Sequence, residues 1–493
     1  MPDRLTSLDA SFLYLEEPTT AMHVGSVMVF QPPDEPAQAF DYDRLVSLIA
    51  TRIALVPRYR QRVREVPGRL ANPVWVDDEN FDVTYHVRRA ALPRPGSEEQ
   101  LEEFVARVQP RPLDRNRPLW EVYLVEGLEH DRFALVTKSH QALVDGVHAV
   151  DIANVLLDSD EEREPDDPAL WRPGRGPSDL ELVAGAMVEA VRRPSQVLEN
   201  VRTGVEDVKA VGARVLGQLG EVVGTLARSA ARPAPTSPLN VQIGEARRFL
   251  MVGTDLDDFR LVRTRLARGA YAAGVTVNDV VLATITGALR NWLLTRGEAV
   301  QPAKTVRAMV PVSVYDAAEG GHVGNRVTAC FVDLPVGEPG ASLRLHQIAY
   351  AMRQQMEGGQ AVAADSLAGL AGFAPPTLHA LGARLGNAMS RRLFNIVITN
   401  VPGPQQPLYA AGARMLSTSP VMPLAKGQAV SIGLTSYDGG VYFGLNADRM
   451  AMPDLGVLGQ CLVDALAELV ELARSRPETV GGRARSGKGG RRR

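Results

Sequence analysis

The sequence has little cysteine and no long apolar segment. Its 493 residues include only two cysteines, Cys330 and Cys461, too few for a disulfide framework. Both lie in apolar runs without a cysteine or histidine at metal-ligand spacing, so we expect buried, reduced thiols. No stretch of 18 apolar residues occurs, since the longest candidate, Val280–Leu294, is interrupted by Arg290 and Asn291. The N-terminal MPDRLTSLDASFLYLEE carries acids and lacks the continuous apolar segment of a signal peptide. These absences predict a cytoplasmic protein that meets a membrane, if at all, from one side.

Neither sign of charge dominates. The chain has 54 Lys and Arg against 57 Asp and Glu, a formal net charge of −3, which gives no reason to expect nucleic-acid binding. The distribution is uneven, because residues 483–493 hold six cations and no anion. Such a tail without interleaved aromatics predicts either a solvated end or attachment to an anionic lipid surface. Hydrophobic residues make up 45%, which provides a core and excludes global disorder.

Repeats of 20–50 residues, Gly-rich phosphate loops and metal-ligand clusters are also missing, which argues against solenoids, nucleotide hydrolysis and a metal site. The length suits about two to four domains. Composition changes at three places: seven acids in residues 158–167, three prolines in residues 230–238, and a Gly- and Arg-rich end after Arg476. We therefore expect a first lobe over 1–175, a helical and proline-rich connector over 176–238, a second lobe over 239–476, and a disordered basic tail over 477–493.

Both lobes show mixed strand and helix patterns, so the expected class is α/β. The first predicts strands over 118–126 and 133–139 and a helix over 147–157. The second predicts a helix over 278–292 capped by Asn278, and a hairpin around Asp438-Gly439 between strands 428–436 and 441–445. Further strands are expected over 305–314, 326–334 and 394–400, and a last helix from Pro453.

The segment that points to chemistry is KSHQALVDGVHAV, residues 138–150. A β-rich run ends at His140, and a short loop leads to Asp145-Gly146 and a helix. A histidine at a strand end is well placed to face a cleft, and Asp145 can hold the loop by accepting backbone N–H groups or pairing with an arginine. Arg115, Arg117 and Arg132 are near in sequence. By spacing alone, one His–Asp pair is weak evidence for catalysis.

This segment resembles the HHxxxDG signature of CoA-dependent acyltransferases. Further blocks, in the same order, resemble the bacterial wax ester synthase/diacylglycerol acyltransferase family of the actinobacterial type. They extend from about residue 5 to 475 and are LTSLDASFLYLEEPTTAMHVGSVMVF, WVDDENFDVTYHV, RPLWEVYLVEGL, LNVQIGEARRF, TVNDVVLA, VPVSV with GNRVTACFVDLP, and FNIVITNVPGPQQPLY.

The resemblance implies a two-lobed fold like that of chloramphenicol acetyltransferase, with a tunnel between the lobes. Acyl-CoA is the implied co-substrate and diacylglycerol or a long-chain alcohol the acceptor, giving triacylglycerol or wax ester. No metal or further cofactor is implied, nor a nucleic-acid partner. A peripheral place on the inner membrane face or on lipid droplets fits these substrates. The implied site residues are His140, Asp145 and Gly146, with Asn278, Asp279, Asn400, Pro402 and Gly403 on the substrate side.

One position departs from the signature. The second histidine, which the family pattern makes the general base, is Gln141 here. A carboxamide has no basic pKa near neutrality and can only make hydrogen bonds. Three interpretations stay open: His140 or His148 serves as the base instead, the site is silent and the lobes only bind acyl-CoA or neutral lipid, or slow turnover persists through positioning and oxyanion stabilisation.

Overall fold

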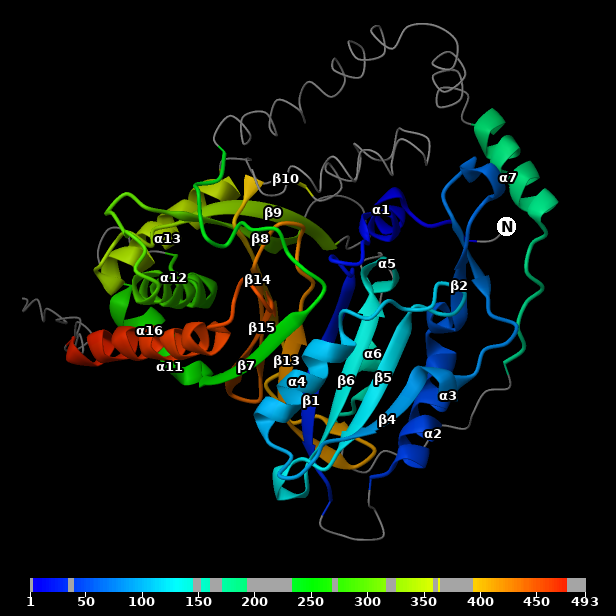
Figure 1. Ribbon diagram of the computed structural model, residues 1–493, viewed down its shortest axis with the longest axis horizontal. Coiled ribbons are helices and arrows are strands. Elements are labelled where there is room, and N and C mark those ends of the chain that lie inside the picture. Colours follow the sequence, from blue (N-terminus) through cyan, green and yellow to red (C-terminus); the bar gives the residue numbers. More distant parts are fainter. Residues whose placement is uncertain are drawn as a thin grey trace, which may run out of the picture.

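The computed structural model describes residues 3–33, 40–144, 152–159, 171–192, 233–267, 274–315, 325–357, 362–363 and 393–476. Two mixed sheets, each with its own helices, form two lobes side by side (Figure 1). This confirms the predicted two-lobed α/β architecture. Residues 147–151 of the predicted helix, most of the acidic loop, most of the connector and the basic tail lie outside the described residues.

The first lobe is built on a six-stranded sheet with the order β12-β13-β1-β6-β5-β4. Side chains alternate along β5: Trp120, Val122 and Leu124 face the core under α1 and α2, whereas Tyr123 and Val125 face α4. Helices therefore cover both faces, which explains why β5 and β6 are buried almost throughout. The strands are β1 (His23–Gln31), β4 (Val87–Ala91), β5 (Trp120–Glu126), β6 (Phe133–His140), β12 (Tyr409–Ala410) and β13 (Ala413–Val421).

Short helices and one small hairpin complete this lobe. The α-helices are α1 (Ser7–Leu15), α2 (Tyr42–Arg52), α3 (Val83–His86), α4 (Glu98–Val108), α5 (Gln141–Val144), α6 (Ile152–Leu156) and α7 (Asp179–Arg192). The 3-10 helices are η2 (Ile53–Leu55), η3 (Pro57–Arg60), η4 (Pro67–Arg69) and η5 (Glu129–Asp131), and the hairpin pairs β2 (Gln61–Arg64) with β3 (Val74–Asp77). Helix α7 packs against this hairpin through Leu182 and Ala186.

The second lobe contains a seven-stranded sheet with the order β10-β9-β8-β11-β14-β15-β7. This sheet and the helices of the lobe share one hydrophobic core. The strands are β7 (Arg247–Asp255), β8 (Val306–Tyr315), β9 (Asn325–Leu334), β10 (Val362–Ala363), β11 (Ile396–Pro402), β14 (Val430–Tyr437) and β15 (Gly440–Asp448). The helices are α11 (Leu256–Leu266), α12 (Val277–Thr295), α13 (Ala341–Glu357) and α16 (Leu455–Ser475).

Most elements predicted from local patterns are confirmed, and two helix starts need correction. The β14–β15 turn has Asp438 at φ 43° and Gly439 at φ 82°, as a tight hairpin requires. Helix α12 is capped by Thr276 rather than by Asn278, because Thr276 and Asp279 form a reciprocal capping box. Helix α16 begins at Leu455, two residues after the predicted start. Both cysteines are free and buried, as expected.

The lobes are joined by strands that cross the predicted lobe boundary. Strands β12 and β13 come from the 239–476 range, yet β13 pairs with β1 in the first sheet. Side chains add to this link: the Glu102 carboxylate accepts the Met251 N–H of edge strand β7 (2.7 Å), and Lys426 pairs with Glu17 (2.7 Å). No helix in the described part of the chain is long and apolar enough to cross a bilayer.

The contact between β13 and β15 depends on a missing side chain at Gly444. A Cβ there would lie 1.8 Å from the carbonyl oxygen of Pro420. We expect Gly444→Ala to destabilise the fold by about 1–3 kcal/mol, because the backbone of one strand must move. Gly456→Ala is the control, since its exposed helical position has nothing within 4 Å and should gain about 0.5–1 kcal/mol. Urea unfolding of both variants measures this, and equal stabilities would contradict the expectation.

Glu102 makes the lobe contact sensitive to pH. Burial, with further repulsion from Glu98 and Glu99, raises the pKa of Glu102 from 4.5 to about 7, despite the opposing Met251 hydrogen bond. A raised carboxyl pKa means that this group's contribution to stability is full below about pH 4.5 and falls as pH rises to about 7. We expect Glu102→Gln, which keeps an acceptor, to be more stable than the parent at pH 8 by about 1–3 kcal/mol. The difference should vanish near pH 4.5, and thermal unfolding at both pH values tests this.

Candidate active site

His140 and His23 face each other at one end of the first sheet. His140 is the last residue of β6 and His23 the first of β1, and the antiparallel register pairs them directly. Their ring centroids are 6.0 Å apart, with the rings edge to face. Both are almost completely buried, at 1% and 3% exposure. The predicted histidine therefore has a second imidazole beside it.

The ring of His140 is fixed by the loop that follows it. The Ala142 N–H donates to Nδ1 of His140 over 3.0 Å, so this nitrogen carries the lone pair. In the neutral ring the proton is then on Nε2, which lies 3.8 Å from Oε2 of Glu16. Burial, assisted by the neighbouring His23 and Arg115 and opposed by Glu16, lowers the pKa of His140 to about 3. His140 is thus a neutral ring with its proton directed towards a carboxylate.

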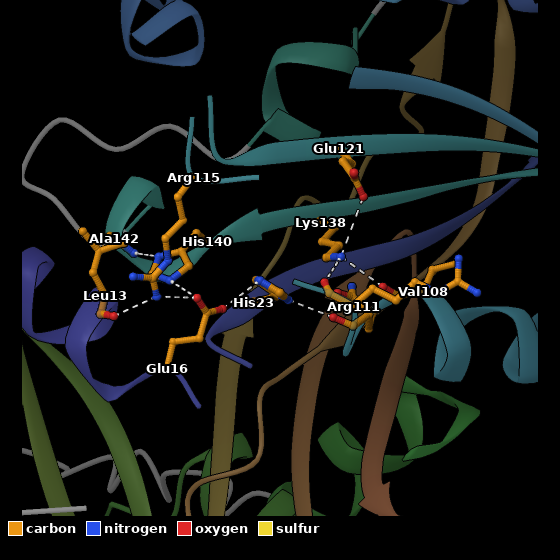
Figure 2. Close-up of polar contacts among 11 residues, drawn as sticks. Leu13, Glu16, His23, Val108, Arg111, Arg115, Glu121, Lys138, His140 and Ala142 are labelled. Carbon is orange, nitrogen blue, oxygen red and sulfur yellow. Dashed lines mark hydrogen bonds and ion pairs between the residues drawn. The ribbon is translucent and has the colours of Figure 1, made fainter. Parts of the chain in front are cut away.

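Glu16 is at the centre of the cluster. It is the C-cap residue of α1, and its side chain is only 11% exposed. One carboxylate oxygen lies 3.1 Å from Nε2 of His23, and the other accepts a hydrogen bond from Arg115 (2.7 Å). Arg115 also donates to the carbonyl of Leu13 at the end of α1 (2.8 Å), as Figure 2 shows. Burial alone would raise the pKa of Glu16, but His23, His140 and Arg115 together hold it well below its usual range.

His23 has oxygen atoms opposite both ring nitrogens. Its Nδ1 lies 2.8 Å from the carbonyl oxygen of Gln109, which can only accept. Its Nε2 faces the Glu16 carboxylate. Since a carbonyl oxygen can only accept, Nδ1 carries a proton in its contact with Gln109, while the 3.1 Å approach of Nε2 to Glu16 is an electrostatic contact.

Lys138, two residues before His140 on β6, points to the same side of the sheet and is fully buried. Its ammonium group donates to the carbonyls of Val108, the last residue of α4 (3.0 Å), and of Arg111 in the loop after it (2.5 Å), and lies 3.7 Å from Glu121. Burial lowers the pKa of Lys138 to about 8 even though Glu121 and Glu16 oppose the shift. A cation at a helix C-terminus is favourable, so Lys138 anchors α4 to the sheet.

Gln141 opens α5 next to these groups. Its backbone N–H donates to the carbonyl of Met22 (2.8 Å) and is therefore not free to bind a substrate oxygen. Its half-buried carboxamide has no partner among the described residues. The side chain is free to donate a hydrogen bond or to accept one. Asp145, Gly146 and His148 lie outside the described residues.

The predicted substrate-side residues form a second group, in the second lobe. Asn400 on β11 donates to the side chain of Asn278 on α12 (3.0 Å), so these two meet. Asp279 is instead held in the capping box with Thr276, and burial raises its pKa. Pro402 ends β11 and is exposed. Gly403 follows it, where a Cβ would lie 2.3 Å from the carbonyl of Ser436.

The lobes meet beside His23 as well. A small pocket there is lined from the first lobe by Ala21, His23 and Gln109 and from the second by residues that include Arg247 and Asn446. Arg247 donates to the carbonyl of Thr19 across this boundary. Within the described ranges, no group of three or more His, Cys, Asp or Glu side chains is arranged to hold a metal ion.

Sequence reasoning missed Glu16, His23 and Arg115. Arg115 was considered only as a partner for Asp145. The available signal was the block LEEPTTAMHVG, which places an acid seven residues before a histidine that starts a strand. Spacing alone does not show that this strand pairs with β6.

Comparison with known proteins agrees with the two-lobed geometry. The wax ester synthase/diacylglycerol acyltransferase catalytic domain matches residues 5–281, and the C-terminal domain of the same family matches residues 323–470. The chain belongs to this family. A probable diacylglycerol O-acyltransferase of Mycobacterium tuberculosis is 33% identical over 485 residues, covering 97% of this chain and 98% of the relative.

Solved structures support the family's fold in this chain. A wax ester synthase/diacylglycerol acyltransferase from Marinobacter aquaeolei is 30% identical, covers 96% of this chain and 100% of its own, and superposes with a TM-score of 0.66. The first condensation domain of the calcium-dependent antibiotic synthetase, 17% identical, has a TM-score of 0.56 over 97% of this chain and 98% of its own. That likeness concerns the fold alone.

Proposed function

We propose that this protein is an acyl-CoA-dependent O-acyltransferase that esterifies diacylglycerol or a long-chain alcohol, giving triacylglycerol or wax ester. The observation that carries the proposal is membership of one acyltransferase family over both lobes, with HQALVDG at the end of β6. The relative and the structural neighbour within the family are both named as acyltransferases, which gives no support to a lipid carrier without activity.

The reaction joins the acceptor oxygen to the thioester carbonyl carbon and breaks the carbon–sulfur bond. The hydroxyl proton ends on the departing CoA sulfur, so atoms and charges balance without another cofactor. In the described conformation the Nδ1 lone pair of His140 is already bound by the Ala142 N–H. His140 therefore acts as a base only after that hydrogen bond opens. This favours a base from His148, or slower turnover in which Gln141 orients the reactants by hydrogen bonds.

The second lobe supplies the other wall of the site in this proposal. The Asn278–Asn400 hydrogen bond joins α12 to β11, and Val401 is 58% exposed beside it. We assign Asn278, Asn400, Pro402 and Gly403 to the channel for acyl-CoA or acceptor, with Asp279 holding the start of α12. Acyl-CoA is a co-substrate, and no resident cofactor or metal is needed.

Restoring the family histidine distinguishes the remaining interpretations. We expect the parent to form ester from radiolabelled acyl-CoA with diacylglycerol or long-chain alcohol, separated by thin-layer chromatography. If Gln141 only orients the reactants, Gln141→His should raise kcat by about 10²–10⁴-fold, the usual effect of a general base. If His148 is the base, Gln141→His should change little and His148→Ala should remove activity. A parent that binds acyl-CoA but forms no ester would contradict the proposed function.

The protein acts in the cytoplasm at a lipid surface, where its acceptors reside. The basic tail supplies attachment, since each cation near an anionic membrane adds about 1 kcal/mol. We expect a variant ending at Arg476 to float less with anionic vesicles than the full chain at low salt. Neutral vesicles are the control. Unchanged flotation on anionic vesicles would exclude the tail as the anchor.

A further inference from the structure

We infer that Glu16 and His23 are positioning residues, which fix His140 in its Nε2-protonated tautomer and thereby hold residues 141–144 at the reacting groups. The inference rests on the proposed acyltransferase function and assigns a role to two residues outside the HQALVDG segment. It starts from the Cα register that pairs His23 with His140 and from the carboxylate that both rings face.

The loop after His140 is held through the lone pair of its ring. His140 has one lone pair in its neutral form, and the Ala142 N–H binds it. The backbone N–H of Gln141 is bound by Met22, and that of His140 by Leu119. Three successive contacts therefore fix the backbone at the start of α5, from which the Gln141 side chain extends. If His140 changed tautomer, its Nδ1–H would meet the Ala142 N–H, and this loop would have to move.

The tautomer of His140 is selected by the carboxylate beside it. Glu16 is the acceptor opposite Nε2 of His140, and a carboxylate favours the ring form that presents a proton to it. At 3.8 Å this is an electrostatic preference rather than a full hydrogen bond. Glu16 does not act alone, because Nε2 of His23 lies 3.1 Å from its other oxygen while Nδ1 of the same ring donates to the Gln109 carbonyl.

Several groups offset the negative charge of the buried Glu16 carboxylate. The groups that face Glu16 are His23 from β1, His140 from β6 and Arg115 from the loop after α4. Lys138 on β6 adds a more distant positive charge that is itself paired with Glu121 on β5. With these neighbours Glu16 stays ionised. A neutral side chain at position 16 would remove the tautomer preference and leave His23 without an anion.

Glu16→Gln tests the inference because it retains size and hydrogen-bonding capacity but removes the charge. We expect kcat for ester formation to fall about 10²-fold, as for misplaced reacting groups, while KM for acyl-CoA changes less than about threefold. Glu16→Asp, which keeps the charge, should recover part of the loss. Glu126→Gln is the matched control, since it removes a carboxylate that pairs with exposed Arg89 in the same lobe, and it should keep the parental kcat.

The ring states give a readout that does not need turnover. In the parent labelled with ¹⁵N-histidine, NMR should show His140 neutral with Nε2 protonated from about pH 5.5 to 8.5, and His23 with a proton on Nδ1, opposite the Gln109 carbonyl. In Glu16→Gln, His140 should populate both tautomers. Spectra of His140→Asn and His23→Gln assign the signals.

Three results would overturn the inference: an Nδ1-protonated His140 in the parent, parental kcat in Glu16→Gln, or additive losses in the Glu16→Gln/His23→Gln double variant. Residues acting as one unit should instead give a double variant no slower than the worse single one. If Glu16→Gln does not fold, the kinetics of His23→Gln and the parental spectra decide. A parent without ester formation counts against the proposed function, while the ring states still decide the arrangement of Glu16, His23 and His140.

Discussion

The site depends on keeping one carboxylate ionised inside the first lobe. Burying an isolated carboxylate costs several kcal/mol, so Glu16 is tolerated only because positive groups and ring protons surround it. Those groups come from β1, from the loop after α4 and from the end of β6. None is close to another in sequence, so the cluster forms only when the sheet has its native order. The site is therefore assembled only in the correctly folded first lobe.

The strands β12 and β13, which cross from the second lobe into the first sheet, help to assemble the site. With β13 on one side and β6 on the other, β1 is an interior strand, and His23 at its start is buried. The same crossing strands bring the second sheet against the first. Gly444 of β15 lies against Pro420 of β13, and the Glu102 carboxylate accepts the Met251 N–H of edge strand β7. An edge strand covered in this way is also protected from pairing with another chain. The lobe boundary and the end of the β1–β6 pair thus form one connected region.

Local signals predicted the parts of this structure that are decided locally. The β14–β15 hairpin follows from Asp438-Gly439, and the buried stripe of α16 follows from leucines at helical spacing. The cap of α12 was misplaced because Asn278 is a good capping residue by type, whereas the reciprocal bonds of Thr276 and Asp279 decide the start. Strand β13 contains Pro420, a residue that is uncommon inside strands, and it pairs with β1 from the other end of the chain. No local pattern therefore predicts it. The motif residues His140 and Gln141 were found by resemblance, but Glu16, His23 and Arg115 needed the β1–β6 register.

Glutamine at position 141, where the family signature has histidine, affects the rate of the reaction rather than its direction. An alcohol is a far weaker acid than a thiol, so the hydroxyl proton moves downhill to the CoA sulfur once the new carbon–oxygen bond forms. A base matters only while that bond is forming, where its loss typically costs about 10²–10⁴-fold. The described site retains what fixes the loop: a neutral His140 bound to Ala142, opposite an ionised Glu16. A carboxamide on such a loop keeps the reactants oriented, and the rigidity supplied by Glu16 and His23 then matters more than it would beside a strong base.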